Sequence, residues 1–142
     1  MNKRDNEMKE LLLNLKTVAI IGCSANKYRT SYHIANYLKE NGIRIFPINP
    51  NYEEVLGVKC LPSLDEIPND ITIDVVDIFR DSQYTADMVR QIIEWSDKTG
   101  QKPVIWTQLN VSSDEAKSLA EETGFTYIEN ECMMVQHERV TA

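Results

Sequence analysis

The 142-residue sequence predicts an α/β fold: a doubly wound, mostly parallel sheet of five to six strands in a three-layer α/β/α arrangement. Two observations lead to this prediction. Short apolar runs rich in β-branched residues, typical of buried parallel strands, alternate along the chain with amphipathic helical segments. The clearest unit is 18–24, where four apolar residues lead into Gly22 and a helix is expected from about residue 31. Such alternation is typical of parallel strands joined by right-handed helical crossovers.

The first half of the chain contains two expected helices and three expected strands. Apolar residues recur at helical spacing over 5–14 and again over 31–41. Thr30 or Ser31 is the expected N-cap of the second helix, and Gly42 ends it. The expected strands are 17–22, 43–48 and 55–61, the last with a turn at Gly57.

The second half continues the alternation. Ser82 is expected to cap a long helix, and Ser112 with Glu115 fits a capping box that opens another. The sequence is therefore divided into an N-terminal helix packed on the domain (1–16), a ligand-binding domain (17–135) and a polar C-terminal tail (136–142). The expected elements here are strands 73–79, 104–107 and 125–128, one helical turn at 63–66, and helices 82–98 and 112–123.

A ligand site is expected at the carboxyl edge of this sheet. The Rossmann strand order 3-2-1-4-5 places a crevice outside the carboxyl ends of strands 17–22 and 73–79. The loop after the first strand carries Ser24, Lys27 and Arg29 between a glycine turn and a helix N-terminus. Backbone N–H groups, the helix dipole and an arginine fork all favour a phosphate there.

Two common phosphate-binding patterns do not fit. The dinucleotide fingerprint G-x-G-x-x-G needs three glycines, and this loop has only Gly22. Asn49 stands where that pattern has an acidic residue for the ribose diol. No G-x-x-x-x-G-K-[ST] sequence occurs. These residues argue against NAD, although the fold alone leaves a sensor of NAD or another adenine nucleotide as an alternative.

A longer series of motifs resembles the small stand-alone CoA-binding proteins of bacteria and archaea. The motifs occur in one order over about residues 10–135, nearly the whole chain. The fold this implies is Rossmann-like and similar to the N-terminal CoA-binding domain of the succinyl-CoA synthetase alpha subunit. The motifs are Gly22-x-Ser24, Arg29-x-Ser31-x-x-Ile34, Pro47-x-Asn49-Pro50, Leu56-Gly57-x-Lys59-Cys60, Ser63-Leu64-x-x-Ile67-Pro68, Asp74-Val75-Val76-Asp77-Ile78-Phe79-Arg80, Trp106-x-Gln108 and Cys132.

The resemblance implies coenzyme A as the ligand. It places the CoA phosphates at turn 22–24 and the basic stretch behind it, and the adenine beside 78–79. Loop 49–51 lacks the lysines of the synthetase domain, so Arg29 or Arg80 is expected to replace them at the 3′-phosphate. Gln108 falls close to the pantetheine path. The implied binding residues are Gly22, Cys23, Ser24, Lys27, Arg29, Ser31, Asn49, Pro50, Asn51, Ile78, Phe79, Arg80 and Gln108.

No catalytic or metal-binding set is expected. Cys132 is either a reactive thiol near the CoA sulfur or an inert free cysteine, and the inert role is favoured. Cys23 is expected to be a small apolar filler and Trp106 a core residue. Asp74 and Asp77 lie three apart on a strand, so they face opposite sides and cannot share one site. Asp77 is expected to be structural, bonding a neighbouring loop.

Composition limits the remaining functions. A net charge of −7 argues against a broad nucleic-acid surface, and no apolar stretch predicts a membrane span or signal peptide, so a cytoplasmic protein is expected. The first hypothesis is a protein that holds CoA or acyl-CoA without catalysis. The alternative is a partner-dependent acyl-CoA ligase or transferase subunit whose partner is unknown. The first helix would suit a homodimer contact.

Overall fold

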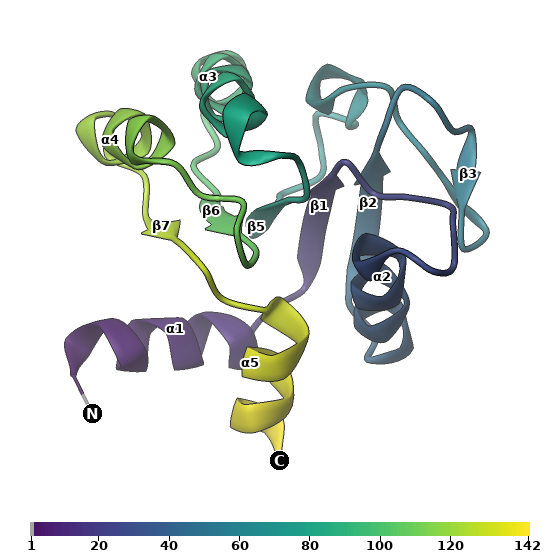
Figure 1. The fold of residues 1–142 in the computed structure, drawn as a ribbon, viewed down its shortest axis with the longest axis horizontal. Coiled ribbons are helices and arrows are strands. Elements are labelled where there is room, and N and C mark those ends of the chain that lie inside the picture. The colour runs from purple at the N-terminus through teal and green to yellow at the C-terminus, as the bar shows by residue number, and fades with distance from the viewer. Residues whose placement is uncertain (1) are drawn as a thin grey trace.

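A five-stranded parallel sheet forms the centre of the protein, whose residues 2–142 are described by a computed structural model (Figure 1). The strand order is β2-β1-β5-β6-β7, and all four neighbouring pairs are parallel. This is a Rossmann-like α/β fold, which confirms the predicted class. The strands are β1 (Thr17–Ile21), β2 (Arg44–Ile48), β5 (Val75–Ile78), β6 (Val104–Thr107) and β7 (Tyr127–Ile128).

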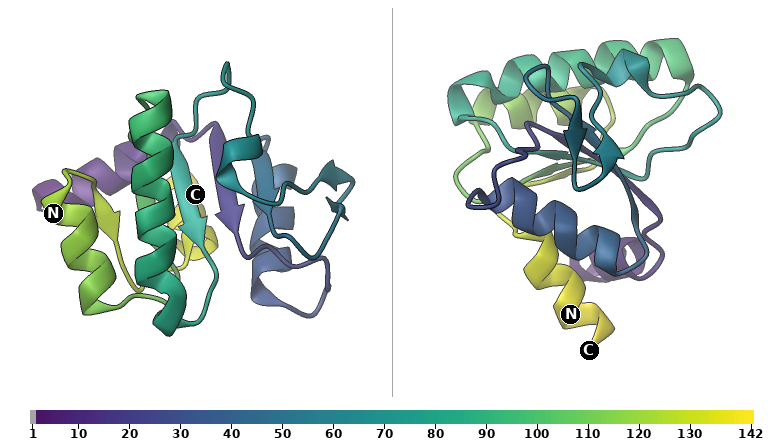
Figure 2. Two further views of the ribbon diagram at one scale, coloured as in Figure 1. Left: turned by 90° about the horizontal axis from the view of Figure 1, so that it is seen from above. Right: turned by 90° about the vertical axis from the view of Figure 1, so that its right-hand side faces the viewer.

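Helices cover both faces of the sheet, as Figure 2 shows in its right-hand view. One face carries α1 (Lys3–Leu13), α2 (Thr30–Glu40) and α5 (Met133–Thr141), and the other carries α3 (Ser82–Thr99) and α4 (Asp114–Glu122). A short 3-10 turn, η1 (Leu64–Glu66), contacts α3. Among the described residues, no helix combines the length and the apolar character that a membrane span requires.

Strand β1 illustrates why the strands are apolar throughout. Successive side chains of a strand point to opposite faces of the sheet. Val18 and Ile20 join the apolar cluster under α1, α2 and α5, whereas Ala19 and Ile21 join the cluster under α3 and α4. Because both faces are covered, all four side chains are buried. The carboxyl end of β1 lies at the edge of the sheet where the site was predicted.

The turn predicted at Gly57 is present, but the predicted strand 55–61 is not one continuous strand. The chain there forms a hairpin of β3 (Glu54–Val55) and β4 (Val58–Lys59), which pair antiparallel in a separate two-stranded sheet. Leu56 and Gly57 have φ angles of 55° and 74°, so the chain reverses over two residues, as tight hairpin turns require. A parallel bridge between Ile48 and Leu61 links this region to β2.

The N-cap of α4 lies one position later than predicted. Ser113, rather than Ser112, caps the helix, and its Oγ accepts the N–H of Ala116 at 3.2 Å. The predicted capping box is therefore wrong. Ser112 instead uses its hydroxyl for contacts with the strand that follows α4.

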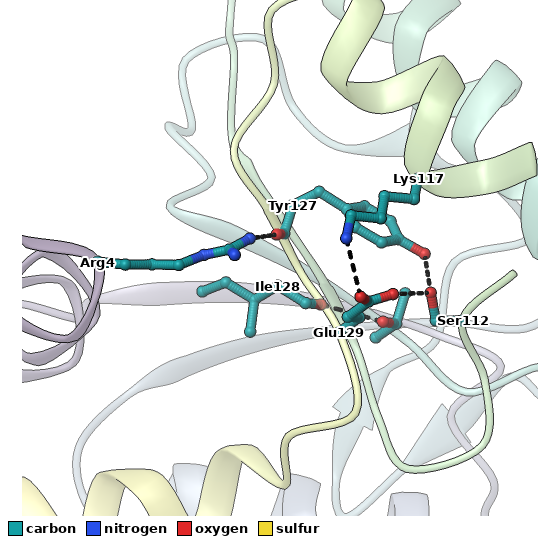
Figure 3. Close-up of polar contacts among 7 residues, drawn as sticks. Arg4, Ser112, Lys117, Tyr127, Ile128 and Glu129 are labelled. Carbon is teal, nitrogen blue, oxygen red and sulfur yellow. Dashed lines mark hydrogen bonds and ion pairs between the residues drawn. The ribbon is translucent and has the colours of Figure 1, made fainter. Parts of the chain in front are cut away.

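These contacts secure β7 at the edge of the sheet (Figure 3). Ser112 Oγ lies 2.8 Å from the hydroxyl of Tyr127 and donates to Glu129 at 2.8 Å. Lys117 Nζ pairs with Glu129 at 3.1 Å, and these two donors lower the pKa of Glu129. From α1, Arg4 donates to the carbonyl oxygen of Tyr127 at 3.3 Å. Arg4 thereby occupies a carbonyl of the edge strand, which would otherwise be free to pair with another strand.

Within the predicted polar tail 136–142, residues 136–141 belong to helix α5. His137 is buried, and a 2.6 Å hydrogen bond joins its Nδ1 to the hydroxyl of Tyr37 on α2. Gln136 is also buried and donates to Glu131 at 2.8 Å. Burial lowers the pKa of His137, which keeps the ring neutral at pH 7. Helix α5 was not predicted because polar residues occupy part of its buried side, so its apolar residues do not recur at clear helical spacing.

Tyr37→Phe is expected to lower the free energy of unfolding by about 1 kcal/mol, because His137 Nδ1 loses its partner in a buried contact. Urea unfolding followed by circular dichroism measures the change. Tyr28→Phe is the matched control, since that ring is 82% exposed, and it is expected to leave stability unchanged. Equal stabilities for the two variants would contradict the importance of the contact between α2 and α5.

Candidate functional site

The turn after β1 depends on glycine. Gly22 has a φ of 81°, and its N–H donates to the carbonyl oxygen of Ile48 at 2.8 Å. A Cβ at this position would lie 2.1 Å from the carbonyl oxygen of Phe79 and 3.3 Å from the side chain of Arg80. Only glycine allows this turn to approach the end of β5 so closely. The ends of β1, β2 and β5 are thereby brought together.

The loop that follows is held from two sides. Ser24 N–H donates to Ser31 Oγ in the first turn of α2 at 3.0 Å, and Ser24 Oγ accepts the N–H of Asn26 at 3.0 Å. From the loop after β2, Asn49 Nδ2 donates to the carbonyl oxygen of Cys23 at 3.0 Å. Asn49 therefore fixes the shape of this loop through its side chain.

Helix α2 begins with its first-turn donors uncapped. Its N-cap is Arg29, rather than the predicted Thr30 or Ser31, and this residue makes no side-chain cap hydrogen bond. Ser31 instead accepts from Ser24, as described above. The first-turn N–H groups of a helix have no intrahelical partners, and the helix dipole makes this end positive.

A cleft of about 640 Å³ lies at this edge of the sheet, within the range of small-molecule sites. Two guanidinium groups line it, Arg29 at the start of α2 and Arg80 after β5. Arg80 lies 4.9 Å above the ring of Tyr84, a cation–π contact that orients it. Positive side chains beside a helix N-terminus favour an anionic ligand such as a phosphate.

Eight of the thirteen predicted binding residues line the cleft. These are Gly22, Ser24, Arg29, Ser31, Asn49, Asn51, Phe79 and Arg80.

The other five lie outside the lining. Cys23 is buried beneath the turn, where burial raises its pKa to about 12 and keeps the thiol protonated, as expected of a small apolar filler. Ile78 points into the core under α3 and α4. Lys27 Nζ lies 5.5 Å above the ring of Tyr28. Pro50 lines a smaller neighbouring cavity of about 200 Å³. Gln108, the fifth, is buried.

Three tyrosines line the cleft that the sequence analysis did not single out: Tyr28, Tyr52 and Tyr84. The Tyr52 hydroxyl lies 3.5 Å from Ser24 Oγ, in the loop after β1. Tyr28 lies in the loop where a phosphate was predicted, and Tyr52 directly follows loop 49–51, so aromatic residues in or beside these loops were an available signal. Their rings add flat apolar surface to a cleft whose other walls are mostly polar, which suits a ligand with an aromatic base.

Comparison with known families decides what kind of domain this is. A family model described as "CoA binding domain" matches residues 16–138, most of the chain. The chain belongs to the CoA-binding domain family.

Relatives of this CoA-binding domain occur in bacteria and archaea. The "Uncharacterized protein YneT" of Bacillus subtilis is 35% identical over 136 residues, which are 96% of each chain. A solved structure, the "hypothetical protein from Pyrococcus horikoshii OT3", is 39% identical with a TM-score of 0.86 and covers 97% of this chain and 92% of that one.

Part of the domain also resembles much larger enzymes. It is 40% identical over 73 residues to an ADP-forming acetate–CoA ligase of Methanocaldococcus jannaschii. This stretch is 51% of the CoA-binding domain described here but only 10% of the ligase. The similarity therefore relates one part of the ligase to this chain, not its whole machinery.

Two aspartates of the CoA-binding domain occupy opposite ends of β5. Asp74 accepts the N–H groups of Lys16 and Thr17 at 2.8 and 3.2 Å, at the end away from the cleft. Asp77 is fully buried and accepts from Nε2 of Gln108. The expectation that Asp77 bonds a neighbouring loop is confirmed. Burial raises its pKa well above the ordinary value, and the Gln108 hydrogen bond opposes that rise.

Other candidate reactive groups lie elsewhere in the CoA-binding domain. Trp106 is fully buried and donates from Nε1 to the carbonyl oxygen of Glu131 at 2.7 Å, which confirms its core role. Cys132 is the partly buried N-cap of α5. Within residues 2–142, no group of three or more His, Cys, Asp or Glu side chains is arranged to hold a metal ion.

Proposed function

We propose that this chain binds coenzyme A or an acyl-CoA in the cleft at the carboxyl ends of β1, β2 and β5, and performs no chemistry of its own there. The observation that carries the proposal is the composition of one cleft. A glycine turn packed against β5, the uncapped start of α2 and two arginines all line it, in a chain of the CoA-binding domain family.

Each part of CoA has a matching part of the cleft. The phosphates are negatively charged, and they suit the start of α2 together with Arg29 and Arg80. The adenine is flat and apolar on its faces, which suits the aromatic lining of Phe79 and the tyrosines. The lining also reaches Val111, beyond the end of β6, so it offers a path for the remaining arm of the ligand.

NAD fits less well, because both polar atoms of the Asn49 side chain are already engaged within the protein and neither is a carboxylate. Its Nδ2 donates to Cys23 at 3.0 Å, and its Oδ1 accepts the N–H of Asn51 at 3.0 Å. A dinucleotide site of the usual kind holds the ribose diol with a free carboxylate at this position.

Calorimetric titration of the purified chain with CoA, dephospho-CoA and NAD tests the proposal. CoA is expected to bind with the highest affinity of the three. Binding of NAD that equals or exceeds that of CoA would overturn the assignment. Native mass spectrometry of the freshly purified protein supplies an independent check, because a retained ligand is identified by its mass.

Arg29→Ala is expected to weaken CoA binding about tenfold or more, since hydrogen bonds to charged groups contribute about 1.5–3 kcal/mol. Arg44→Ala is the matched control. It removes one positive charge at the start of β2, the end of that strand remote from the cleft, where Arg44 lies over the ring of Phe46. Equal effects of the two substitutions would show that only net charge matters, and the site would be misplaced.

The similarity to acetate–CoA ligases favours one second candidate, a subunit that supplies the CoA site to a separate catalytic protein. This candidate predicts acyl-CoA turnover only when such a partner is added. Of the described residues that line the cleft, none is a cysteine or histidine, so the chemical groups of a ligase would have to come from that partner.

A further inference from the structure

Asp77 is a buried carboxyl group near the carboxyl end of β5, close to the edge of the sheet where the cleft lies. It lies on β5, two residues before Phe79, which lines the cleft. Nε2 of Gln108 donates to both of its carboxylate oxygens, at 3.0 and 2.9 Å. The Gln108 carboxamide thus turns its nitrogen toward Asp77 and its oxygen away.

The oxygen of that carboxamide is the free end. Within residues 2–142, every fully buried side-chain nitrogen or oxygen has a hydrogen-bond partner. The hydrogen bonds of the Gln108 side chain are made by Nε2, and no described residue donates one to Oε1. Oε1 is therefore not fully buried, although the residue as a whole is 5% exposed. Gln108 directly follows β6 at the carboxyl edge, and its carbonyl oxygen accepts the N–H of Val111 at 3.2 Å. Val111 lines the cleft, and Gln108 lies just behind that lining at the β6 side of the same edge.

We propose that Asp77 is a positioning residue: it holds the Gln108 carboxamide so that Oε1 accepts a hydrogen bond from an amide N–H of the pantetheine arm of CoA. This inference rests on the proposed function. Phosphates carry no donors and belong at the start of α2, whereas the pantetheine arm carries two amide N–H groups. Asp77 itself touches no ligand and acts through Gln108.

Asp77→Asn tests the orientation with almost no change in shape. The introduced amide both donates and accepts, so it pairs with Gln108 in either orientation and no longer fixes where Oε1 points. CoA binding is expected to weaken about tenfold, the equivalent of one lost hydrogen bond. Binding of adenosine 3′,5′-bisphosphate, which has the adenine and phosphates but no pantetheine arm, is expected to stay unchanged. Equal weakening of both ligands, or of neither, would overturn the inference.

A paired exchange provides the rescue. In Asp77→Asn combined with Gln108→Glu, the introduced carboxylate accepts from the introduced amide and still presents an acceptor oxygen to the edge. Net charge is the same as in the wild type. CoA affinity is expected to return to within about threefold of the wild-type value, most of the lost hydrogen bond. An exchange that binds CoA no better than Asp77→Asn alone would contradict the positioning role.

Two further measurements keep this inference separate from the proposed function. Gln108→Ala removes the acceptor together with the hydrogen bonds that Gln108 donates to Asp77, and it is expected to weaken CoA about tenfold and adenosine 3′,5′-bisphosphate not at all. In the ligand-free protein, NMR of the Gln108 side-chain amide is expected to show protection from hydrogen exchange that Asp77→Asn removes. Protection in both proteins would overturn the orientation itself. A wild-type chain that shows the protection but fails to bind CoA would overturn the proposed function and, with it, the pantetheine contact.

Discussion

Gly22→Ala is expected to abolish measurable CoA binding and to lower the free energy of unfolding by about 2–5 kcal/mol. Two separate costs combine at this position. A non-glycine residue is strained at a φ of 81°, and its Cβ would collide with the carbonyl oxygen of Phe79 at 2.1 Å. The backbone of β1 or β5 has to move to relieve the collision, and both strands end in the cleft. Urea unfolding and CoA calorimetry measure the two effects.

Gly42→Ala separates the two costs. Gly42 has a similar φ of 77°, but a Cβ there would meet no atom within 4 Å. This variant is expected to lose only about 1 kcal/mol of stability through backbone strain and to bind CoA normally. If the two alanine variants lost equal stability, the approach of the turn to Phe79 would not be the reason for glycine at position 22.

Asp77→Asn is expected to raise the free energy of unfolding at pH 7. Burial raises the pKa of Asp77 above its value in the unfolded chain, so the folded protein holds this proton more tightly than the unfolded one. The wild type therefore loses stability as pH rises from the ordinary pKa of an aspartate, about 3.9, toward the raised value. An asparagine does not titrate and avoids that loss.

Urea unfolding of both proteins between pH 4 and pH 8 measures this difference. The stability advantage of the variant is expected to be small at pH 4 and to grow as pH rises. Other titrating groups, such as Glu129, cancel in the comparison because both proteins contain them. A constant or shrinking difference would contradict the prediction. A variant that gains stability while losing CoA affinity would show that this buried charge is kept at a cost to stability.

The central part of the fold was predictable because its signals are local. Residues 18–24 read as a buried strand and a glycine turn, and that turn lines the cleft. Loops far apart in sequence could be assigned to one site, since parallel strands bring their carboxyl ends to the same edge. At 54–59 the turn at Gly57 was predicted, but the antiparallel hairpin was not, because it also needs a positive φ at Leu56 and leucine rarely adopts one.

The finer contacts of the site depend on register, which the sequence does not show. Asp77 pairs with Trp106, so that the side chain two residues later, Gln108, reaches it from the neighbouring strand. A shift by one residue would have put Gln108 on the other face. The same alternation of side chains along β5 decides where Ile78 points. Its side chain faces the core rather than the cleft.

Helix α5 has a consequence for how the protein is made. It contributes no residue to the cleft lining, yet its His137 holds Tyr37, in the second half of the helix whose first turn lines the cleft. All cleft residues lie between positions 22 and 111, so the ribosome completes them before it begins α5. The nascent chain therefore carries every residue of the cleft lining before the back of α2 is secured. A product that stops short of Met133 has every cleft residue and lacks the helix that holds α2 from behind.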